Sequence, residues 1–593
     1  MIGRRAFVGG GLGAALLSAP AVRAWAQSGP PTLVLHNARI TTQAGRDGQA
    51  IALREGMVQA VGSNRQIRAL AGTGTRMLDL RGARVIPGLN DSHLHLTRQA
   101  RFHNLELRWE SVTSLDEGLR MIAEQAKRTP AGQWVRVVGG WSRAQMRERR
   151  SPTPEELNAA APNTPVMVLF LYSEAILNRA GVQALGITSE TKPPPPGKGM
   201  RYDIQPSGGA ILRAEPYPQL LYKAIADLPA LSPADQANSA QHWYRELNRL
   251  GLTSAVDAGG GGHLWPDDYT ATGKLAEAGA LPIRIGSYLF PQKAGEELAA
   301  FKGWTANERL AVNRAAELLE GFTVEGAGEN LVASAGDYEN FLSPRPELGT
   351  TMERDLTEVV EVLARAQWPI RLHATYDQSI TRMLDVFEPV FKATGYRARW
   401  AFDHAETISP RNIARVRALG GGVSVQDRLA YAGELFAERY GAATAGDAPP
   451  LRALLAAGIP LGAGTDGTRV SGYNPWVALR WMTTGQTAAG TVLRPPSARL
   501  SRAQALRAFT IGSAWFSGDE TRKGRLAPGQ FADLAVLSED YFSVPGERIA
   551  QIQSVLTVTG GRIVSGGGEF ASLAPQLPPV SPPWSPVAHF GAR

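Results

Sequence analysis

Eight short apolar runs, each ending in polar or glycine residues, punctuate the middle of this sequence. They occupy residues 85–89, 253–257, 283–289, 322–326, 370–373, 400–404, 422–426 and 459–466. Helix-like segments such as "TMERDLTEVVEVLARAQ" and "ISPRNIARVRALG" lie between several of them. Strands that alternate with helices favour a parallel sheet, and eight such units predict an α/β fold, the (β/α)₈ barrel of the TIM type.

Segments rich in predicted strands bracket these runs. Residues 32–84 and 523–568 alternate apolar and polar residues, with glycine at the bends. We therefore expect one small β-sandwich domain built from both chain ends, beside a barrel of residues 85–522. Residues 98–250 separate the first run from the second and contain their own strands and helices, which indicates an inserted subdomain. The Pro-rich residues 574–593 are expected to extend along the surface.

The first 26 residues predict an export signal. Arg4 and Arg5 precede a short Gly/Ala-rich apolar stretch, and Ala24-Trp25-Ala26 is typical of a cleavage site. The arginine pair resembles the twin-arginine type, which predicts a periplasmic or extracellular protein. An uncleaved N-terminal anchor is the alternative, although the stretch is short for a membrane span. No stable membrane insertion is expected.

The composition restricts the partners of this chain. It contains no cysteine, so any metal must be held by histidine, a carboxylate or a modified lysine, which favours borderline or harder divalent ions. The formal charge of +8 is spread over many arginines, without a basic tract interleaved with aromatic residues. We therefore expect a small-molecule substrate and no nucleic acid.

Four of the nine histidines fall at the ends of three apolar runs. His93 and His95 follow the first run, and residues two apart in a strand face the same side. His373 ends the fifth run, His404 the sixth, and Asp466 the eighth. Because barrel enzymes carry their catalytic groups at the carboxyl ends of the strands, we expect these five side chains to meet. The other histidines are predicted to be structural or solvated: His36, His103, His242, His263 and His589.

The motifs "VIPGLNDSHLHL", "LHATYD", "FDHAE" and "GTDG" resemble, in this order, those of the amidohydrolase superfamily. The flanking β-rich segments and the long insertion are similar to its YtcJ-like branch, the amidohydrolase-3 type. The resemblance implies that the four histidines and Asp466 bind a divalent metal, one or two ions. Imidazoles and a carboxylate suit Zn²⁺ or a similar ion. The resemblance also implies a homodimer.

The activity that this resemblance implies is hydrolysis by water. The metal lowers the pKa of the water and polarises the substrate carbonyl, while Asp466 accepts the water proton and passes it to the leaving nitrogen. Our leading hypothesis is cleavage of a C–N bond in an amide, N-acyl, cyclic amide or carbamate-like substrate. The alternatives are an ester, lactone or phosphoester substrate, and a non-enzymatic binding or regulatory protein on the same scaffold.

The fourth run differs from the corresponding strand of many relatives, which ends in a carboxylated lysine or a glutamate. Here it reads "GFTVEGAGEN" and contains no lysine. We predict Glu325 as the metal ligand, with Glu329 as the alternative and a merely salt-bridged glutamate as a third possibility. The absence of a lysine favours one metal or a pair bridged by glutamate.

The insertion also differs from that of many relatives. Many YtcJ-like relatives carry a Gly-His pair followed by an asparagine; here Asn178 aligns with the asparagine, but Tyr172-Ser173 replace the pair. Substrate specificity is therefore not carried over. Aromatic residues at strand ends are either pocket or packing residues, and an arginine there either binds a carboxylate or forms a surface salt bridge. The predicted substrate-binding residues are Trp141, Tyr172, Tyr376, Gln426 and Arg428.

Overall fold

The computed structural model describes residues 29–194, 199–214, 218–310, 321–338, 341, 345 and 347–591. The predicted export signal, residues 1–26, lies outside this range.

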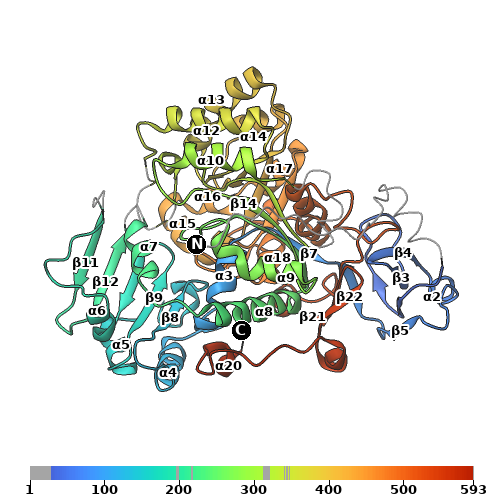
Figure 1. The fold of residues 1–593 in the computed structure, drawn as a ribbon, viewed down its shortest axis with the longest axis horizontal. Coiled ribbons are helices and arrows are strands. Elements are labelled where there is room, and N and C mark those ends of the chain that lie inside the picture. The colour runs from blue at the N-terminus through green and yellow to red at the C-terminus, as the bar shows by residue number, and fades with distance from the viewer. Residues whose placement is uncertain are drawn as a thin grey trace.

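Eight parallel strands form a nearly closed barrel, as the apolar runs predict. In Figure 1 the barrel lies between the sheet of the insertion, at the left, and the N-terminal strands of the small β-domain, at the right. The last strand returns to the first, because the backbone N–H of Asp466 donates to the carbonyl of His93 at 2.9 Å. The predicted (β/α)₈ fold is therefore confirmed. In ring order the strands are β7 (Leu89–Leu94), β13 (Leu252–Asp257), β14 (Arg284–Leu289), β15 (Phe322–Ala327), β16 (Ile370–Ala374), β17 (Trp400–His404), β18 (Gly422–Gln426) and β19 (Leu461–Gly464).

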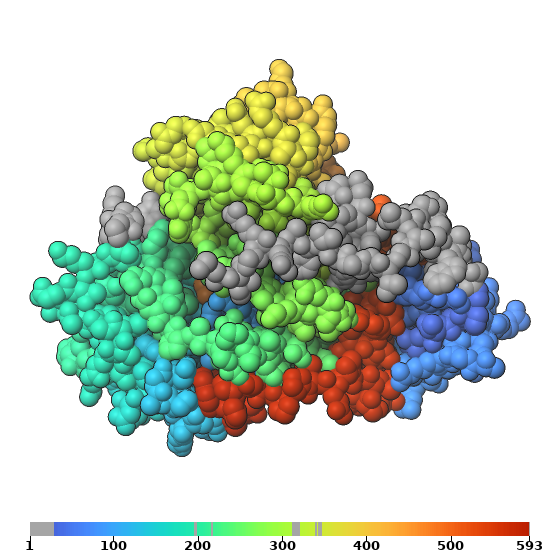
Figure 2. Space-filling model, in the orientation of Figure 1, coloured from blue at the N-terminus to red at the C-terminus, as the bar shows by residue number. Residues whose placement is uncertain are grey.

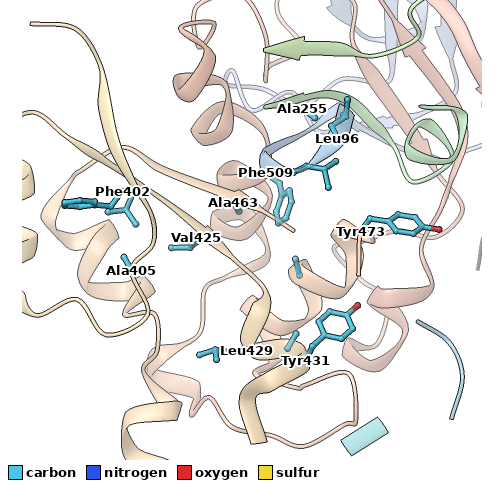
Figure 3. Packing of buried hydrophobic residues seen from close by; sticks show 14 of the residues in the cluster. Leu96, Ala255, Phe402, Ala405, Val425, Leu429, Tyr431, Ala463, Tyr473 and Phe509 are labelled. Carbon is cyan, nitrogen blue, oxygen red and sulfur yellow. The ribbon is translucent and has the colours of Figure 1, made fainter. Parts of the chain in front are cut away.

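Helices follow the strands and cover the barrel. In α12, Met352, Leu356, Val359 and Leu363 are buried, which is the spacing of a helix with one apolar face. Figure 3 shows part of the main core, where residues of β17, β18 and β19 lie near residues of α15. No helix of the described chain combines the length and the apolar character that crossing a bilayer requires. The helices are α9 (Thr270–Glu277), α10 (Glu297–Asn307), α12 (Met352–Arg365), α13 (Asp377–Thr394), α14 (Pro410–Ala418), α15 (Arg428–Tyr440), α16 (Ala442–Gly446), α17 (Leu451–Ala457), α18 (Pro475–Thr484) and α19 (Arg502–Arg507).

The first barrel strand lies further along the chain than the apolar run at residues 85–89 predicts. That run mostly belongs to β6 (Arg84–Pro87), which pairs antiparallel with β20 (Leu534–Leu537) in the small β-domain. The barrel strand begins after Gly88. A Cβ atom at Gly88 would lie 2.0 Å from Oγ1 of Thr253, so only glycine fits where the chain passes from one sheet to the other.

Both chain ends contribute to the small β-domain. Its two sheets share one buried core that includes Leu35, Ile51, Val536 and Leu556, as in a β-sandwich. One sheet contains β4 (Met57–Gly62), β3 (Ala50–Arg54), β1 (Leu33–His36) and β5 (Arg76–Asp79), with α2 (Asn64–Arg68) beside it; the other contains β2 (Arg39–Ile40), β6, β20, β21 (Ser554–Thr559) and β22 (Arg562–Gly566).

A buried ion pair joins this domain to the barrel. Nε of Arg284 in β14 donates to Asp533 at 2.9 Å, and the guanidinium lies over the ring of Phe531. Because Asp533→Ala removes the carboxylate that pairs with the buried arginine, we expect it to lower the free energy of unfolding by about 3–5 kcal/mol, seen as a lower midpoint in calorimetry. Glu124→Ala, which breaks an exposed pair with Arg120, should cost under about 1 kcal/mol. Equal midpoints in the two variants would contradict this prediction.

The residues between β7 and β13 contain a sheet of their own. α3 (Leu96–Phe102) and α8 (Pro233–Arg249) pack against each other and against β13, so both ends of the predicted insertion, residues 98–250, lie against the barrel. The sheet between these helices has a separate core that includes Met167, Leu169 and Leu212. It contains β11 (Met200–Ile204), β12 (Ala210–Ala214), β10 (Glu174–Leu177), β9 (Val166–Phe170) and β8 (Val135–Val138), with α4 (Leu115–Ala126), α5 (Pro154–Ala160), α6 (Arg179–Ala184) and α7 (Gln219–Ala226) around it.

The C-terminal residues run along one edge of the molecule, from the small β-domain towards the insertion (Figure 2). Side chains of α8 donate hydrogen bonds to this segment, from Asn238 to the carbonyl of Pro579 and from Arg245 to that of Pro575. The segment ends in the short helix α20 (Pro586–Phe590).

Candidate metal centre

Six buried side chains that can bind a metal meet at the carboxyl ends of the barrel strands. β7 carries the first histidine and delivers the second just beyond its end; β16 and β17 carry the other two histidines. One carboxylate follows β15 and the other follows β19. The six residues are His93, His95, Glu329, His373, His404 and Asp466.

Glu329 lies in the middle of this cluster. Its Oε2 is 3.1 Å from Nδ1 of His373 and 3.1 Å from Nε2 of His404. The same oxygen is 3.6 Å from Nε2 of His93, and Oε1 is 3.5 Å from Nε2 of His95. One carboxylate therefore contacts both the histidine pair from β7 and the pair from β16 and β17.

Asp466 approaches the cluster from the opposite side of the ring. Its Oδ1 is 3.2 Å from Nε2 of His95 and 3.6 Å from Nε2 of His93. The residue has a φ of +53°, in the left-handed region that residues other than glycine rarely adopt. Backbone conformations of this kind persist where surrounding structure enforces them, often at functional sites.

The donor set fits a divalent ion. Three overlapping groups of three ligand atoms lie within 4.8 Å, and Glu329 belongs to two of them. Nε2 of His93 is buried without a hydrogen-bond partner in the described structure, which leaves its lone pair available. Distances of 3.1–3.6 Å between neighbouring donors are close to the edge of about 3.4 Å that a tetrahedral site with bonds of about 2.1 Å requires.

Partners behind the histidines orient the rings. Nδ1 of His93 lies 3.1 Å from Asp403, Nδ1 of His95 is 2.9 Å from the carbonyl of Gly259, and Nε2 of His373 is 3.3 Å from Asp337. Such contacts select the nitrogen that faces the metal. Sequence reasoning missed both aspartates. Asp403 stands directly before His404 in "FDHAE", a signal that was present, whereas Asp337 lies in a loop without any motif.

Asp403→Asn should weaken metal binding by about 10- to 100-fold, the range for partners of this kind. The substitution removes the charge that orients His93, and Asp403 also pairs with Arg371. Competition with a coloured chelator measures the affinity, and circular dichroism checks that the variant is folded. A folded variant with wild-type metal affinity would contradict the orienting role.

Burial and neighbouring charges shift the pKa values of the side chains in this cluster. Burial opposes ionisation of Glu329, but His93 and hydrogen bonds with His373 and His404 hold its pKa well below the ordinary value. Burial also opposes ionisation of Asp466, while the bond with His95 and the neighbouring imidazoles lower its pKa. Burial lowers the pKa of His93 despite nearby carboxylates. Burial favours the neutral forms of His373 and His404 as well, but their hydrogen bonds with Glu329 help to raise the pKa of both. The two acids and His93 thus favour the forms that bind metals, whereas metal binding would displace protons from His373 and His404.

The structure corrects the choice of Glu325 as the ligand from the fourth strand. Glu325 lies inside β15, where its Oε1 accepts a hydrogen bond from Thr323 at 2.6 Å. Burial raises its pKa to about 7, with Asp519 nearby. Since β15 runs on to Ala327, the chain reaches the carboxyl end of the barrel only at Glu329, the alternative ligand.

A cavity of about 570 Å³ opens over the cluster and is bordered by His95, Glu329, His373 and Asp466. Residues of the insertion form one of its walls. Among the predicted substrate-binding residues, Tyr172 and Arg428 line this cavity. The ring of Tyr172 packs edge-on against another wall residue, Tyr222, at 5.0 Å between centroids.

Arg428 does not form the surface salt bridge that we considered. Its side chain is buried, and Nη2 donates to Oε1 of Glu406 at 2.6 Å. The same guanidinium lies 3.9 Å from Asp466. Its charge is therefore already matched within the protein.

The other three predicted substrate-binding residues lie outside the cavity and serve packing. Nε1 of Trp141 donates to the carbonyl of Leu169 in the insertion at 2.9 Å. The hydroxyl of Tyr376 lies 3.3 Å from that of Tyr440, and Nε2 of Gln426 donates to Ser424 within its own strand. Asn178, which aligns with an asparagine of relatives, caps α6.

Comparisons with known proteins identify the family of this chain and relate its fold to solved structures. A model described as "Amidohydrolase family" matches residues 76–565. N-substituted formamide deformylase of Arthrobacter pascens is 25% identical over 555 residues, 89% of this chain and 97% of its own. YtcJ of Bacillus subtilis strain 168 is 24% identical over 552 residues, which are 87% of this chain and 96% of its own. The crystal structure of an uncharacterized metal-dependent hydrolase from Pyrococcus horikoshii OT3 has a similar fold, with a TM-score of 0.62 at 20% identity over 87% of this chain and 99% of its own. The chain belongs to the amidohydrolase family.

Proposed function

We propose that this protein is a divalent-metal-dependent hydrolase that cleaves a C–N bond in a small amide, N-acyl, cyclic amide or carbamate-like molecule. The observation that carries the proposal is the position of Asp466, whose carboxylate borders both the histidine cluster and the cavity. Similarity to a formamide deformylase supports a C–N bond as the target.

The four histidines and the two carboxylates would hold the metal, for which we propose zinc. When bound, such an ion polarises the substrate carbonyl and lowers the pKa of water. The protein itself moves the proton. As the water oxygen bonds to the carbonyl carbon, Asp466 accepts a proton from the water; as the C–N bond breaks, Asp466 returns that proton to the nitrogen and ends unchanged.

We propose that Glu329 would hold metal together with both histidine pairs, in a site with room for two ions. Its two oxygens face both histidine pairs, and the two groups that contain it share no histidine. A carboxylated lysine, the other common bridge, has no candidate in the fourth strand.

Metal analysis and a substrate screen test the proposal together. Protein loaded with zinc and dialysed should retain the metal in elemental analysis and hydrolyse at least one compound among matched amides, cyclic amides, carbamates, esters, lactones and phosphoesters. Activity confined to the last three classes would refute C–N cleavage and keep the metal chemistry. A protein that binds no divalent ion after loading would favour the non-enzymatic alternative.

We also propose that the protein is exported. The support is the sequence pattern of Arg4-Arg5, an apolar stretch and Ala24-Trp25-Ala26. Expression with the intact N-terminus should yield a periplasmic protein that begins at Gln27. Retention of the full N-terminus on protein in the cytoplasm would contradict export.

A further inference from the structure

Two arginines that line the cavity have no ion-pair partner for their charge among the residues that the structure describes. Arg98 lies in α3, three residues after His95, and Arg469 lies three residues after Asp466. Their exposed fractions are 3% and 7%. Neither guanidinium forms a hydrogen bond or an ion pair with any residue that the structure describes, and Nη2 of Arg98 is fully buried without a partner.

The other cationic side chains around the cavity are matched. Arg101 pairs with Asp268 at 2.9 Å, and Lys223 pairs with Asp227 at 2.6 Å. The guanidinium of Arg428 has Glu406, as described above. A buried charge without a partner is costly to fold, so two of them at the same cavity call for an anion from outside the protein.

The unmatched charge lies next to the candidate metal ligands. A Cβ atom built at Gly260 would be 3.2 Å from Nη1 of Arg98 and 3.4 Å from Nδ1 of His95, so these two groups share one small space. Burial and the charge of Arg469 lower the pKa of Arg98. Burial and the surrounding arginines hold the pKa of His263, on the same wall, well below its ordinary value. This side of the cavity is therefore rich in positive charge. The charge of Asp466 acts on Arg98, but in the described structure Asp466 forms no ion pair with either arginine.

We propose that Arg98 and Arg469 bind a carboxylate of the substrate, so that the molecule hydrolysed is a carboxylate-bearing amide. The inference rests on the proposed function, because the anion would be held beside the same cluster that acts on the C–N bond. Guanidinium groups bind carboxylates through paired, charge-assisted hydrogen bonds and cannot lose their charge near neutral pH. Apolar side chains of Phe102, Phe290 and Val470 also line the cavity and suit an apolar remainder of the ligand.

Binding to an inactive variant tests this without hydrolysis. Metal-loaded Asp466→Asn protein is titrated calorimetrically with N-acetylphenylalanine and with its uncharged carboxamide. The acid should bind at least about tenfold more tightly, since a hydrogen bond to a charged group contributes this much or more. Adding Arg98→Met or Arg469→Met should weaken binding of the acid by about 10- to 100-fold and leave the carboxamide unchanged.

Two controls separate this role from a structural one. Arg101→Met removes an arginine that lines the cavity but is already paired, and should leave the affinity for the acid within about fivefold. Without ligand, Arg98→Met and Arg469→Met should melt at or above the temperature of the parent, because each removes an unmatched buried charge. An arginine that holds the fold would show a lower midpoint.

Equal binding of acid and carboxamide, or unchanged binding of the acid after both arginine substitutions, would overturn the inference. If the arginines bind the acid but wild-type protein hydrolyses no amide, the proposed function fails and the carboxylate site remains. If neutral amides are hydrolysed and the acid does not bind through the arginines, the carboxylate site fails and the proposed function remains.

Discussion

Asp466→Asn is expected to lower kcat/KM for hydrolysis by about a hundredfold to ten-thousandfold while the protein keeps its metal. The carboxamide fills the same space next to His95 but cannot accept the proton of the attacking water. The histidines and Glu329 still provide donors for the ion. Steady-state kinetics on the best substrate of the screen, together with elemental analysis of the same sample, measure both quantities.

Asp427→Asn is the matched control for this loss. Asp427 follows β18 at the same end of the barrel, and burial raises its pKa well above the ordinary value. Burial therefore favours the protonated form of Asp427, and a neutral asparagine is close to that form in shape and charge. We expect this variant to retain most of its activity. Equal losses in the two variants would mean that Asp466 has no specific part in proton transfer.

Seven of the eight barrel strands could be predicted because a strand covered on both faces forms a continuous apolar run. Residues 422–426, for example, coincide with β18. The first strand could not be placed in this way. β6 and β7 follow each other with Gly88 between them, and both are apolar because one is buried in the β-domain and the other in the barrel. A single apolar run does not reveal which of two sheets each of its halves joins.

The candidate site was predictable to the same degree. His373, His404 and Asp466 end apolar strands, and this position alone places them together in a barrel. The fourth-strand ligand depends on where β15 ends. The pairing of β14 with β15 shifts register after Ser287, so that Val324 and Gly326 are paired while Glu325 between them is passed over. Such an irregularity leaves no mark in the sequence.

Which arginines of the cavity lack a charged partner was beyond sequence reasoning for a related reason. Arg98 and Arg428 are both close to predicted site residues along the chain. They differ in their surroundings: Glu406 lies beside the guanidinium of Arg428, whereas that of Arg98 has no partner among the described residues. Pairing of charges between distant segments is a property of the folded chain.

Glu329→Gln is expected to weaken metal binding by at least about a hundredfold, beyond the usual effect of residues that only orient ligands. The substitution removes the negative charge at the centre of the cluster, where one oxygen contacts His93, His373 and His404. A neutral amide balances less of the ion's charge, and its nitrogen is not a donor for zinc. Chelator competition gives the affinity, and elemental analysis gives the number of ions per chain. A drop from two ions to one or none would support the bridging position of Glu329.

Glu325→Gln decides between the two glutamates because it makes the same chemical change four residues earlier. Burial raises the pKa of Glu325 to about 7, so at neutral pH glutamine replaces a side chain that is already partly uncharged. Its hydrogen bond with Thr323 can be kept by the amide oxygen. The variant should therefore bind as much metal as the wild type, with the same affinity. Loss of metal from Glu325→Gln together with retention by Glu329→Gln would reverse the assignment and return the ligand to the middle of β15.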